Sequence, residues 1–400
     1  MALDVLIILT VLATGALLWL PGVKNAAAWR AAVTPLASII GSGFLVLGPI
    51  LDFAYGKWAP AAMAGLCVIA YLLGSAIRYN IVHQQGAGGT KLTRGVDVAS
   101  SAVLAFAYVI SVAYYLNLFG AFGLSLVVEA NPSSARLLTS AVFAVILFFG
   151  WTGGFKSLEG LEYASVSLKL AIIAGLLIGL GEYFFEKTAN GELVLNDMNR
   201  HGWAGLTLAF GLIITVQGFE TSRYLGGEYN AQVRARSMRL AQLLSTLIYM
   251  IYIVLLAYIF KRGDLKLSET AIVDMTRVVA AILPFFLVAA ALAAQFSAAV
   301  ADTSGSGGLV EEFTGGKVSQ RGGYAILVVI GLAITWSSSV FQIISYASRA
   351  FAMYYCLQAF IAAILARKEG ASLRFALYSC LSLLSLAIVI FGTSVENGTG

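Results

Sequence analysis

The chain is poor in charge, in histidine and in cysteine. Only 11% of its 400 residues are charged, against about 25% in soluble globular domains, and 60% are hydrophobic. The two histidines and the three cysteines (Cys67, Cys356 and Cys380) show no spacing that would hold a metal, so we expect neither a metal site nor a cofactor. No nucleophile–base pair and no phosphate-binding loop is recognisable, so we do not expect an enzyme.

Loops long enough for a soluble domain are also missing, and the apolar residues are grouped instead in long runs. Runs of about 18–25 residues can cross a hydrocarbon core of about 30 Å as helices. The alternation typical of barrel strands is absent. The sequence therefore predicts an all-α membrane protein with about twelve transmembrane helices. The expected spans are 3–20, 32–54, 59–79, 98–128, 137–151, 160–181, 204–225, 238–260, 279–301, 324–340, 342–366 and 373–393.

The net charge of +5 does not indicate nucleic-acid binding, because cytoplasmic loops of membrane proteins carry an excess of Lys and Arg. The excess of Lys and Arg falls on the cytoplasmic side if the loop before residue 32 faces the cytoplasm. With twelve spans, both termini then lie outside. Residues 3–20 resemble a signal peptide in length only, since Asp4 replaces its basic start, and we expect a retained extra helix. We expect a multi-pass protein of the plasma membrane, the inner membrane in a bacterium.

One lysine, Lys169, lies inside the otherwise apolar run 163–180. A cation at bilayer depth costs about 2.5–3.5 kcal/mol on insertion scales, so such a residue normally faces a protein interior or a watery cavity. Helical spacing puts Glu162, Ser165 and Lys169 on one face. Two interpretations stay open: Lys169 takes part in a transport cycle, or it is a permanent charge paired with Asp302 or with a backbone carbonyl.

Two of the expected spans carry helix-breaking residues. In the first, Pro35 removes a backbone donor and Gly41-Ser42-Gly43 lowers helix propensity. In the second, Gly218 stands between Gln217 and Phe219. Counted from residue 32, these are the first and the sixth helices, and breaks at matching places of two five-helix halves point to an inverted-repeat transporter. The alternative is that the glycines only allow close helix packing.

A broken helix within a bilayer leaves amides and carbonyls unpaired, which is tolerated only where they line a cavity or a site. Freed N–H groups at the start of a half-helix attract an anion such as a carboxylate. Freed carbonyls attract an ammonium group or a metal cation. Two facing breaks therefore predict a site for a zwitterion.

Three motifs carry a resemblance to a known family. They are Ile40-Gly-Ser-Gly-Phe44, Gly218-Phe-Glu220 followed by 226–230 and a basic loop, and Gly154-Phe-Lys-Ser157 followed by Leu168-Lys-Leu170. In this order they resemble the amino acid–polyamine–organocation (APC) transporter superfamily, which has the leucine-transporter-type fold. The resemblance covers about 32–393 and implies a 5+5 inverted-repeat core with broken first and sixth core helices. The implied division is an extra helix and loop at 1–31, a first repeat at 32–184, a second at 185–366, and a final helix and tail at 367–400.

The resemblance also implies a substrate site between the two breaks. The substrate carboxylate would bind the amides around Gly41, Ser42 and Gly43, and its amine the carbonyls around residues 214–217. Gln217 and Phe219 would shape the side-chain pocket, and a tyrosine of the third core helix could reach it, although amphipathic packing also explains those tyrosines. The substrate-binding residues implied are Ser38, Gly41, Ser42, Gly43, Tyr114, Tyr115, Thr215, Gln217, Gly218, Phe219 and Glu220.

For coupling, the resemblance favours a proton or no ion over sodium. The hydroxyl pair of sodium-coupled relatives falls near Ala298-Ala299 here, with Ser297 alone beside it. Lys169 instead matches a lysine that occupies the sodium position in proton-coupled or uncoupled relatives. It would bridge the first and eighth core helices when charged and release them when neutral. The coupling residues implied are Lys169, Ala37, Ile40, Ser297 and Asp302, although Asp302 could simply mark the end of its helix.

Two further ionisable residues leave alternatives open. Glu220 could recognise a cationic group or carry a proton, or it could pair with Arg223 one turn on. Arg349 could close an outer gate with Asp52, or it could extend toward the headgroups.

We therefore expect a secondary active transporter of amino acids or related small amines, working by alternating access and either proton-coupled or sodium-independent. Its partners would be a small solute, the lipid bilayer and protons, with no nucleic acid. The alternatives are the same fold carrying an inorganic cation or a sodium-coupled solute, and a membrane sensor that does not transport.

Overall fold

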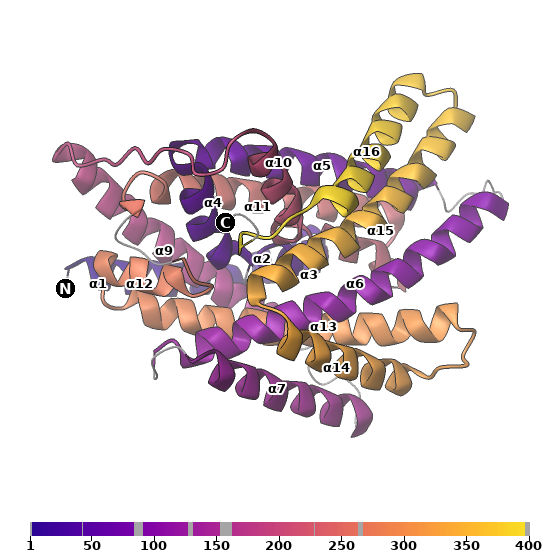
Figure 1. Cartoon of the computed structure of the whole chain (residues 1–400), viewed down its shortest axis with the longest axis horizontal. Coiled ribbons are helices and arrows are strands. Elements are labelled where there is room, and N and C mark those ends of the chain that lie inside the picture. The colour runs from indigo at the N-terminus through magenta and orange to yellow at the C-terminus, as the bar shows by residue number, and fades with distance from the viewer. Residues whose placement is uncertain are drawn as a thin grey trace.

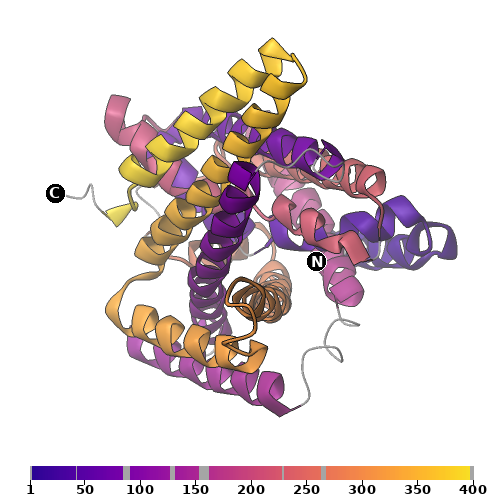
Figure 2. The ribbon, with the colours of Figure 1, turned by 90° about the vertical axis from the view of Figure 1, so that its right-hand side faces the viewer.

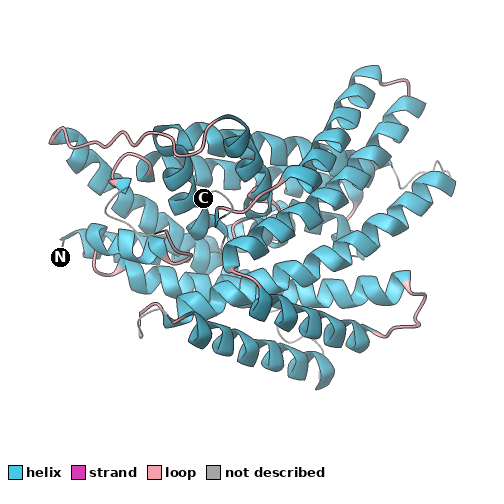
Figure 3. Cartoon of the chain, viewed as in Figure 1, coloured by secondary structure: helices cyan, strands magenta, loops and turns pink. Residues whose placement is uncertain are grey.

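The computed structural model describes residues 2–41, 43–83, 91–126, 131–152, 162–227, 229–262 and 267–396. Figure 3 shows that this part of the chain is built from helices and connecting loops, without strands. The prediction of an all-α membrane protein is therefore confirmed. The helices are α1 (Ala2–Trp19), α2 (Pro21–Lys24), α3 (Ala27–Ile39), α4 (Gly43–Tyr55), η1 (Gly56–Trp58), α5 (Ala59–His83), α6 (Lys91–Leu124), α7 (Pro132–Thr152), α9 (Glu162–Ala189), α10 (Gly202–Gly211), η2 (Ile213–Val216), η3 (Phe219–Gly227), α11 (Ala231–Leu256), α12 (Ala271–Val279), α13 (Leu283–Phe313), α14 (Gln320–Ser337), α15 (Val340–Lys368) and α16 (Ser372–Phe391).

Nine helical stretches in the described residues are long and apolar enough to cross a membrane, so the expected number of twelve is not established. One of the nine, Gly43–His83, contains both α4 and α5. The expected spans 32–54 and 204–225 are interrupted, as α3/α4 and as α10/η2/η3. The expected span 324–340 corresponds to α14, which ends at Ser337 and is not among the nine.

Several helices begin where a polar side chain can pair the first free amides. The Asn230 side chain accepts a hydrogen bond from Val233 N at the start of α11 (2.9 Å). Ser339 and Gln342 form a reciprocal capping box at the start of α15. Such caps fix the beginning of a helix to a particular residue, because the first four N–H groups of a helix have no partner within it.

The two halves of the chain repeat one order of elements. A broken helix followed by α5, α6, α7 and α9 is matched by a second broken helix followed by α11, α13, α14 and α15. Elements at the same place in each half pack against each other, as α5 does on α11, α6 on α13 and α7 on α14. Figures 1 and 2 both show α7 beside α14 at one edge of the bundle. This arrangement is what an inverted repeat requires, while the division at 32–184 and 185–366 stays a prediction.

The helix α1 packs on α9, outside this repeated order. Gly175 and Gly179 of α9 make room for Ile7, which is fully buried although most of α1 is exposed. The Tyr163 hydroxyl of α9 donates to the carbonyl of Leu18 near the end of α1. The helix α1 thus packs against α9, the helix that carries Lys169.

Gly56 allows a sharp turn between α4 and α5. Its φ is +51°, a left-handed conformation that disfavours any residue with a Cβ, and an added Cβ would meet the carbonyl of Asn196. Lys57 N donates to that same carbonyl (2.8 Å), so the loop segment at Asn196 cannot move away from the turn without losing a hydrogen bond. The turn therefore needs glycine for two separate reasons.

We predict that Gly56→Ala lowers the melting temperature of the purified protein more than Gly191→Ala does. Gly191 also has a positive φ (+69°), but an added Cβ there meets nothing within 4 Å. Both variants carry a conformational cost of about 1–2 kcal/mol, and only Gly56→Ala adds the clash. Thermal melts in detergent measure both, and equal losses would contradict the contact with Asn196.

Candidate functional site

The two helix breaks lie against each other. The first lies between α3, which ends at Ile39, and α4, which begins at Gly43. The second lies between α10 and η3, where Gln217 is extended and Gly218 has φ +118°. An added Cβ at Gly43 would lie 3.1 Å from Thr215 Cα, and one at Gly218 would lie 2.5 Å from Ser38 Oγ. Both predicted breaks are therefore present, and they meet with almost no space between their backbones.

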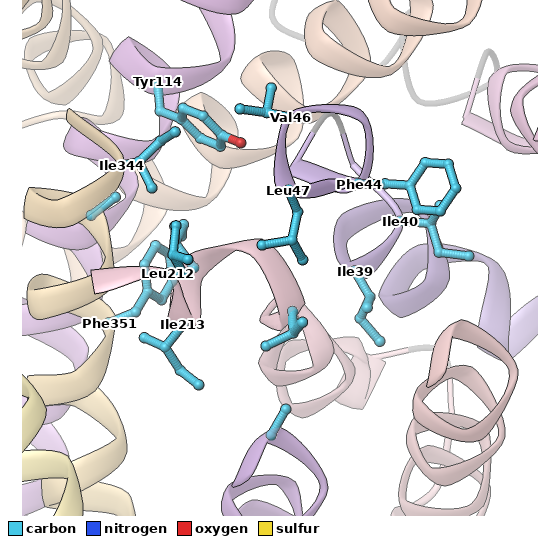
Figure 4. Close-up of a cluster of buried hydrophobic side chains, with 14 of the residues drawn as sticks. Ile39, Ile40, Phe44, Val46, Leu47, Tyr114, Leu212, Ile213, Ile344 and Phe351 are labelled. Carbon is cyan, nitrogen blue, oxygen red and sulfur yellow. The ribbon is translucent and has the colours of Figure 1, made fainter. Parts of the chain in front are cut away.

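Apolar side chains from both breaks form one buried cluster. Figure 4 shows Leu47 of α4 between Ile39 of the first break and Leu212 and Ile213 of the second, with Tyr114 pointing its hydroxyl toward α4. All five residues are at most 4% exposed. Peptide groups buried in these surroundings are out of reach of bulk water, so they need partners from the protein, from a buried water or from a solute.

Tyr249 of α11 supplies a partner to both breaks at once. Its hydroxyl lies 2.7 Å from the carbonyl oxygen of Ile39 and 2.8 Å from that of Thr215. The ring is 1% exposed. One hydroxyl thus pairs the last carbonyl of α3 and a carbonyl of η2, and holds the two breaks together.

Ser348 of α15 pairs the second break from the other side. Its hydroxyl donates to the carbonyl of Gly211 (2.7 Å) and accepts from the amide of Ile214 (3.0 Å). This one side chain therefore bridges the point at which α10 ends and the tighter turn of η2 begins.

Glu220 is fully buried beside the extended residues of the second break. Its Oε2 accepts from Gly218 N (3.0 Å) and from the Tyr355 hydroxyl (2.9 Å), while Oε1 has no hydrogen-bond partner among the described residues. The same hydroxyl lies 3.3 Å from Gln217 Oε1, and the Tyr355 ring stacks on Phe219 at 5.2 Å between centroids. The predicted residues Gln217, Phe219 and Glu220 thus surround Tyr355 of α15, which the sequence did not suggest.

Lys169 of α9 bonds to the first broken helix. Its Nζ donates to the carbonyl of Ala37 (2.8 Å), and the side chain is 4% exposed. On the same face, Thr34 Oγ1 donates to Glu162 Oε2 (3.3 Å) and Ser165 Oγ donates to the Ala293 carbonyl of α13 (3.3 Å). The three residues that share a face by spacing therefore connect α9 to both α3 and α13.

Asp302 of α13 is not the partner of Lys169. It accepts a hydrogen bond from Ser111 of α6, and both side chains are buried. Of the two pairings left open for a structural Lys169, the backbone carbonyl is the one present. Ser297 is half-buried on α13 and takes part in none of these contacts, and Ile40 continues the last turn of α3 through a bond from its amide to Leu36 O (3.0 Å).

Gln295 is a buried polar residue that the sequence analysis did not single out. It is 0% exposed on α13, and neither of its amide atoms has a hydrogen-bond partner in the described residues. It lies seven residues before Asp302, so both point to one side of α13. A buried amide without partners calls for an explanation, and a bound solute or water is the simplest.

A polar network closes one end of the bundle around Arg223 of η3. Its Nη2 lies 2.5 Å from Asp97 Oδ1 of α6, and its Nη1 donates to Gln358 of α15. Asn80 of α5 also donates to Gln358 (2.9 Å). The interpretation that Glu220 pairs with Arg223 is therefore wrong, because the chain turns Arg223 toward α6 and α15.

A second network covers the opposite end. Asn196 Nδ2 donates to Asp52 Oδ1 (3.3 Å), and Arg262 N donates to Asn196 Oδ1 (3.2 Å). Lys57 donates to Asp197 (3.0 Å) and so lowers the pKa of that exposed carboxyl below its ordinary value. The loop 190–201 thereby lies over the C-terminal ends of α4 and α11.

The expected gate between Arg349 and Asp52 is not formed. Arg349 Nε donates to the carbonyl of Val389 in α16 (2.6 Å), on an exposed face, whereas Asp52 is buried against Asn196. The pairing failed because α16 lies beside α15 at this depth and offers Arg349 a nearer acceptor.

The remaining predicted residues divide into two groups. Tyr114 and Tyr115 lie next to the first break, since their rings come within 3.2 Å and 3.8 Å of a Cβ added at Gly43 and Gly41. Ser42 and the motif at 154–157 lie outside the described residues. The residues that sequence reasoning missed are Tyr249, Ser348 and Tyr355, each a hydroxyl in an apolar helix, for which a single sequence gives no local signal.

Comparison with known proteins gives two matches. A family model described as APC superfamily transporter matches residues 21–392. A protein of Aquifex aeolicus (strain VF5) is 42% identical over 388 residues, covering 94% of this chain and 93% of the relative, and is described only as an uncharacterized protein.

We predict that Tyr249→Phe destabilises the protein and that Tyr252→Phe does not. Removing the Tyr249 hydroxyl leaves two buried carbonyls without this partner, at a cost of about 1–3 kcal/mol. Tyr252 lies one turn further along α11, is 0% exposed, and its hydroxyl has no partner among the described residues, so its loss should be neutral or favourable. Thermal melts compare the two, and a neutral Tyr249→Phe would show that the bridge contributes nothing.

Proposed function

Because the chain belongs to the APC superfamily of transporters, we propose that it is a secondary active transporter that moves amino acids or related small amines by alternating access. The observation that supports this most directly is the contact between two broken helices deep in the bundle, paired there by Tyr249. Breaks inside a bilayer are costly unless they line a site. Two of them meeting at one point indicate where the solute binds.

A buried carboxylate beside the breaks supports an amine-bearing substrate. Glu220 has one oxygen bonded to Gly218 and Tyr355, and the other without a partner among the described residues. An ammonium group would pair that oxygen and would offset the cost of burying the charge. The amide of Gln295 is a second candidate contact for a polar solute.

The contact between Gly218 and Ser38 leaves no room for a solute, so binding requires the two breaks to move apart. The hydrogen bonds of Tyr249 to Ile39 and Thr215 would be exchanged for bonds to the substrate. The Arg223–Asp97 network at one end and the Asp52–Asn196 network at the other would open alternately. Water would then enter from one side at a time.

For coupling, we propose that Lys169 takes the place of a sodium ion. Its ammonium already donates a hydrogen bond to the carbonyl of Ala37. The Ala298-Ala299 pair provides no hydroxyls that could bind sodium. Loss of the proton would remove the charge from the Lys169–Ala37 hydrogen bond and so weaken the connection between α9 and α3. The first broken helix would then be released in step with a proton.

The proposed function predicts saturable exchange in liposomes containing the purified protein. Vesicles loaded with a mixture of unlabelled amino acids and amines should take up labelled members of the same mixture faster than empty vesicles. A sensor would bind without exchange. Uptake of rubidium or sodium in the absence of any organic solute would favour the same fold carrying an inorganic cation, and would contradict an amine substrate.

The coupling proposal predicts that Lys169→Met keeps exchange but loses accumulation driven by a pH gradient. Methionine retains the apolar stem and removes the group that binds and releases a proton. The matched control is Ser165→Ala, which removes a hydrogen bond between α9 and α13 from the same face and leaves the charge in place. If Lys169→Met still accumulates solute along a pH gradient, coupling lies at another residue.

A further inference from the structure

A pocket of about 290 Å³ lies on the side of the bundle, and one of its lining residues, Ile213, belongs to the second break. Its walls come from α5, α10 and α16, from the end of α4, from the loop before α10 and from η2. Most of the lining is apolar, including Gly65, Leu66, Ile69, Leu206, Phe210 and Ile388. The volume is close to the lower end of the range for small-ligand sites, about 300 Å³.

The pocket opens toward the bilayer. Gly65 and Leu206 are exposed on the lateral surface, and a Cβ added at Gly65 would meet nothing within 4 Å. Because Gly65 lies in the membrane-crossing stretch Gly43–His83, the space next to this opening is expected to contain lipid chains rather than water. An apolar occupant can therefore enter sideways.

One end of the pocket is polar and lies at the level of the headgroups. Arg200, half-buried in the loop before α10, lines that end together with Tyr55. Trp203 (59% exposed) lies at the start of α10, and Trp58 (55% exposed) ends η1 directly before α5. Exposed tryptophans at helix ends are typical of the membrane–water interface. The pocket thus begins at the interface with a cation and continues inward with apolar walls.

We propose that this pocket binds one phospholipid, with an acyl chain between α5 and α10 and its phosphate at Arg200. The distribution of charge is complementary, since a guanidinium pairs well with a phosphate oxygen and the rest of the site offers only apolar contacts. One nitrogen, Nη2, donates to Val395 O (3.1 Å), which holds the guanidinium at the mouth of the pocket. A bound chain would remove the apolar walls from contact with the mobile lipid around them.

The bound chain would also touch the second broken helix. Ala209 and Phe210 of α10 and Ile213 of η2 line the pocket, and Ile213 stands next to the Ile214 amide that Ser348 binds. This consequence alone depends on the proposed function: if α10 moves during transport, the lipid moves with it or opposes it. Binding itself does not depend on transport.

The test is native mass spectrometry of the full-length protein, purified in a mild detergent and supplemented with a defined phosphatidylglycerol. Wild type should retain one lipid of the added mass. Gly65→Leu fills the open space in the pocket, and loss of contacts equal to about two methylene groups should weaken retention about tenfold. Gly95→Leu is the matched control, because Gly95 is also an exposed helical glycine with nothing within 4 Å of an added Cβ.

A second variant, Arg200→Gln, tests the headgroup. It should lower retention of phosphatidylglycerol severalfold while leaving retention of the uncharged diacylglycerol unchanged. The proposal is overturned if Gly65→Leu retains as much lipid as Gly95→Leu, if wild type binds a free fatty acid in preference to the phospholipid, or if the pocket variants instead change the proportion of dimer. Native mass spectrometry measures lipid binding and does not measure transport. If lipid binding fails, the proposed function is unaffected, and if transport fails, the lipid proposal is unaffected.

Discussion

Two helices of this protein are interrupted inside the apolar interior, and each interruption frees peptide groups that must be paired. An unpaired buried amide or carbonyl costs about 1–3 kcal/mol, and more where only hydrocarbon surrounds it. The pairing is done by side chains from three other helices: Lys169 of α9, Tyr249 of α11 and Ser348 of α15. The positions of α9, α11 and α15 around the breaks follow from this requirement.

Under the proposed alternating access, the same contacts would let the interior take two states. Tyr249 has one hydroxyl proton for two carbonyls, so a substrate that supplies a donor to either carbonyl competes with it directly. Lys169 and Glu220 are a buried cation and a buried carboxylate, each bonded to a different broken helix. A change in the charge of either one alters how tightly that helix is held, which is the kind of bistable element that alternating access needs.

The sequence predicted the features set by neighbouring residues, such as helix breaks and shared helix faces. It did not predict contacts that depend on how distant helices are placed relative to one another. Both breaks could be located because Gly43 and Gly218 act on their own backbone, whereas Pro35 lies within α3, which continues to Ile39. The spacing of Glu162, Ser165 and Lys169 predicted a shared face, and the structure confirms it. The residues' roles in binding and coupling stay predictions.

The partners of charged residues were harder to predict. One interpretation paired Arg223 with Glu220, the carboxylate close to it in sequence, but Arg223 pairs with Asp97, which lies 126 residues away on α6. One of the two interpretations of Arg349 paired it with Asp52, but Arg349 bonds to a backbone carbonyl, which no sequence pattern marks. The long α6, which crosses the bundle obliquely in Figure 1, brings Asp97 and Ser111 to partners whose register a single sequence does not specify.

Glycine at the breaks was considered either a helix breaker or a packing residue, and the structure shows that one residue does both. Gly218 takes φ +118°, which interrupts the helix, and its missing Cβ is also what allows Ser38 to approach. Gly43 starts α4 and leaves space for the backbone of Thr215. The two breaks can meet only because each has glycine at the point of contact, so close packing is the condition under which Tyr249 can reach both carbonyls. A side chain at either position would separate the breaks and remove the bridge along with the site.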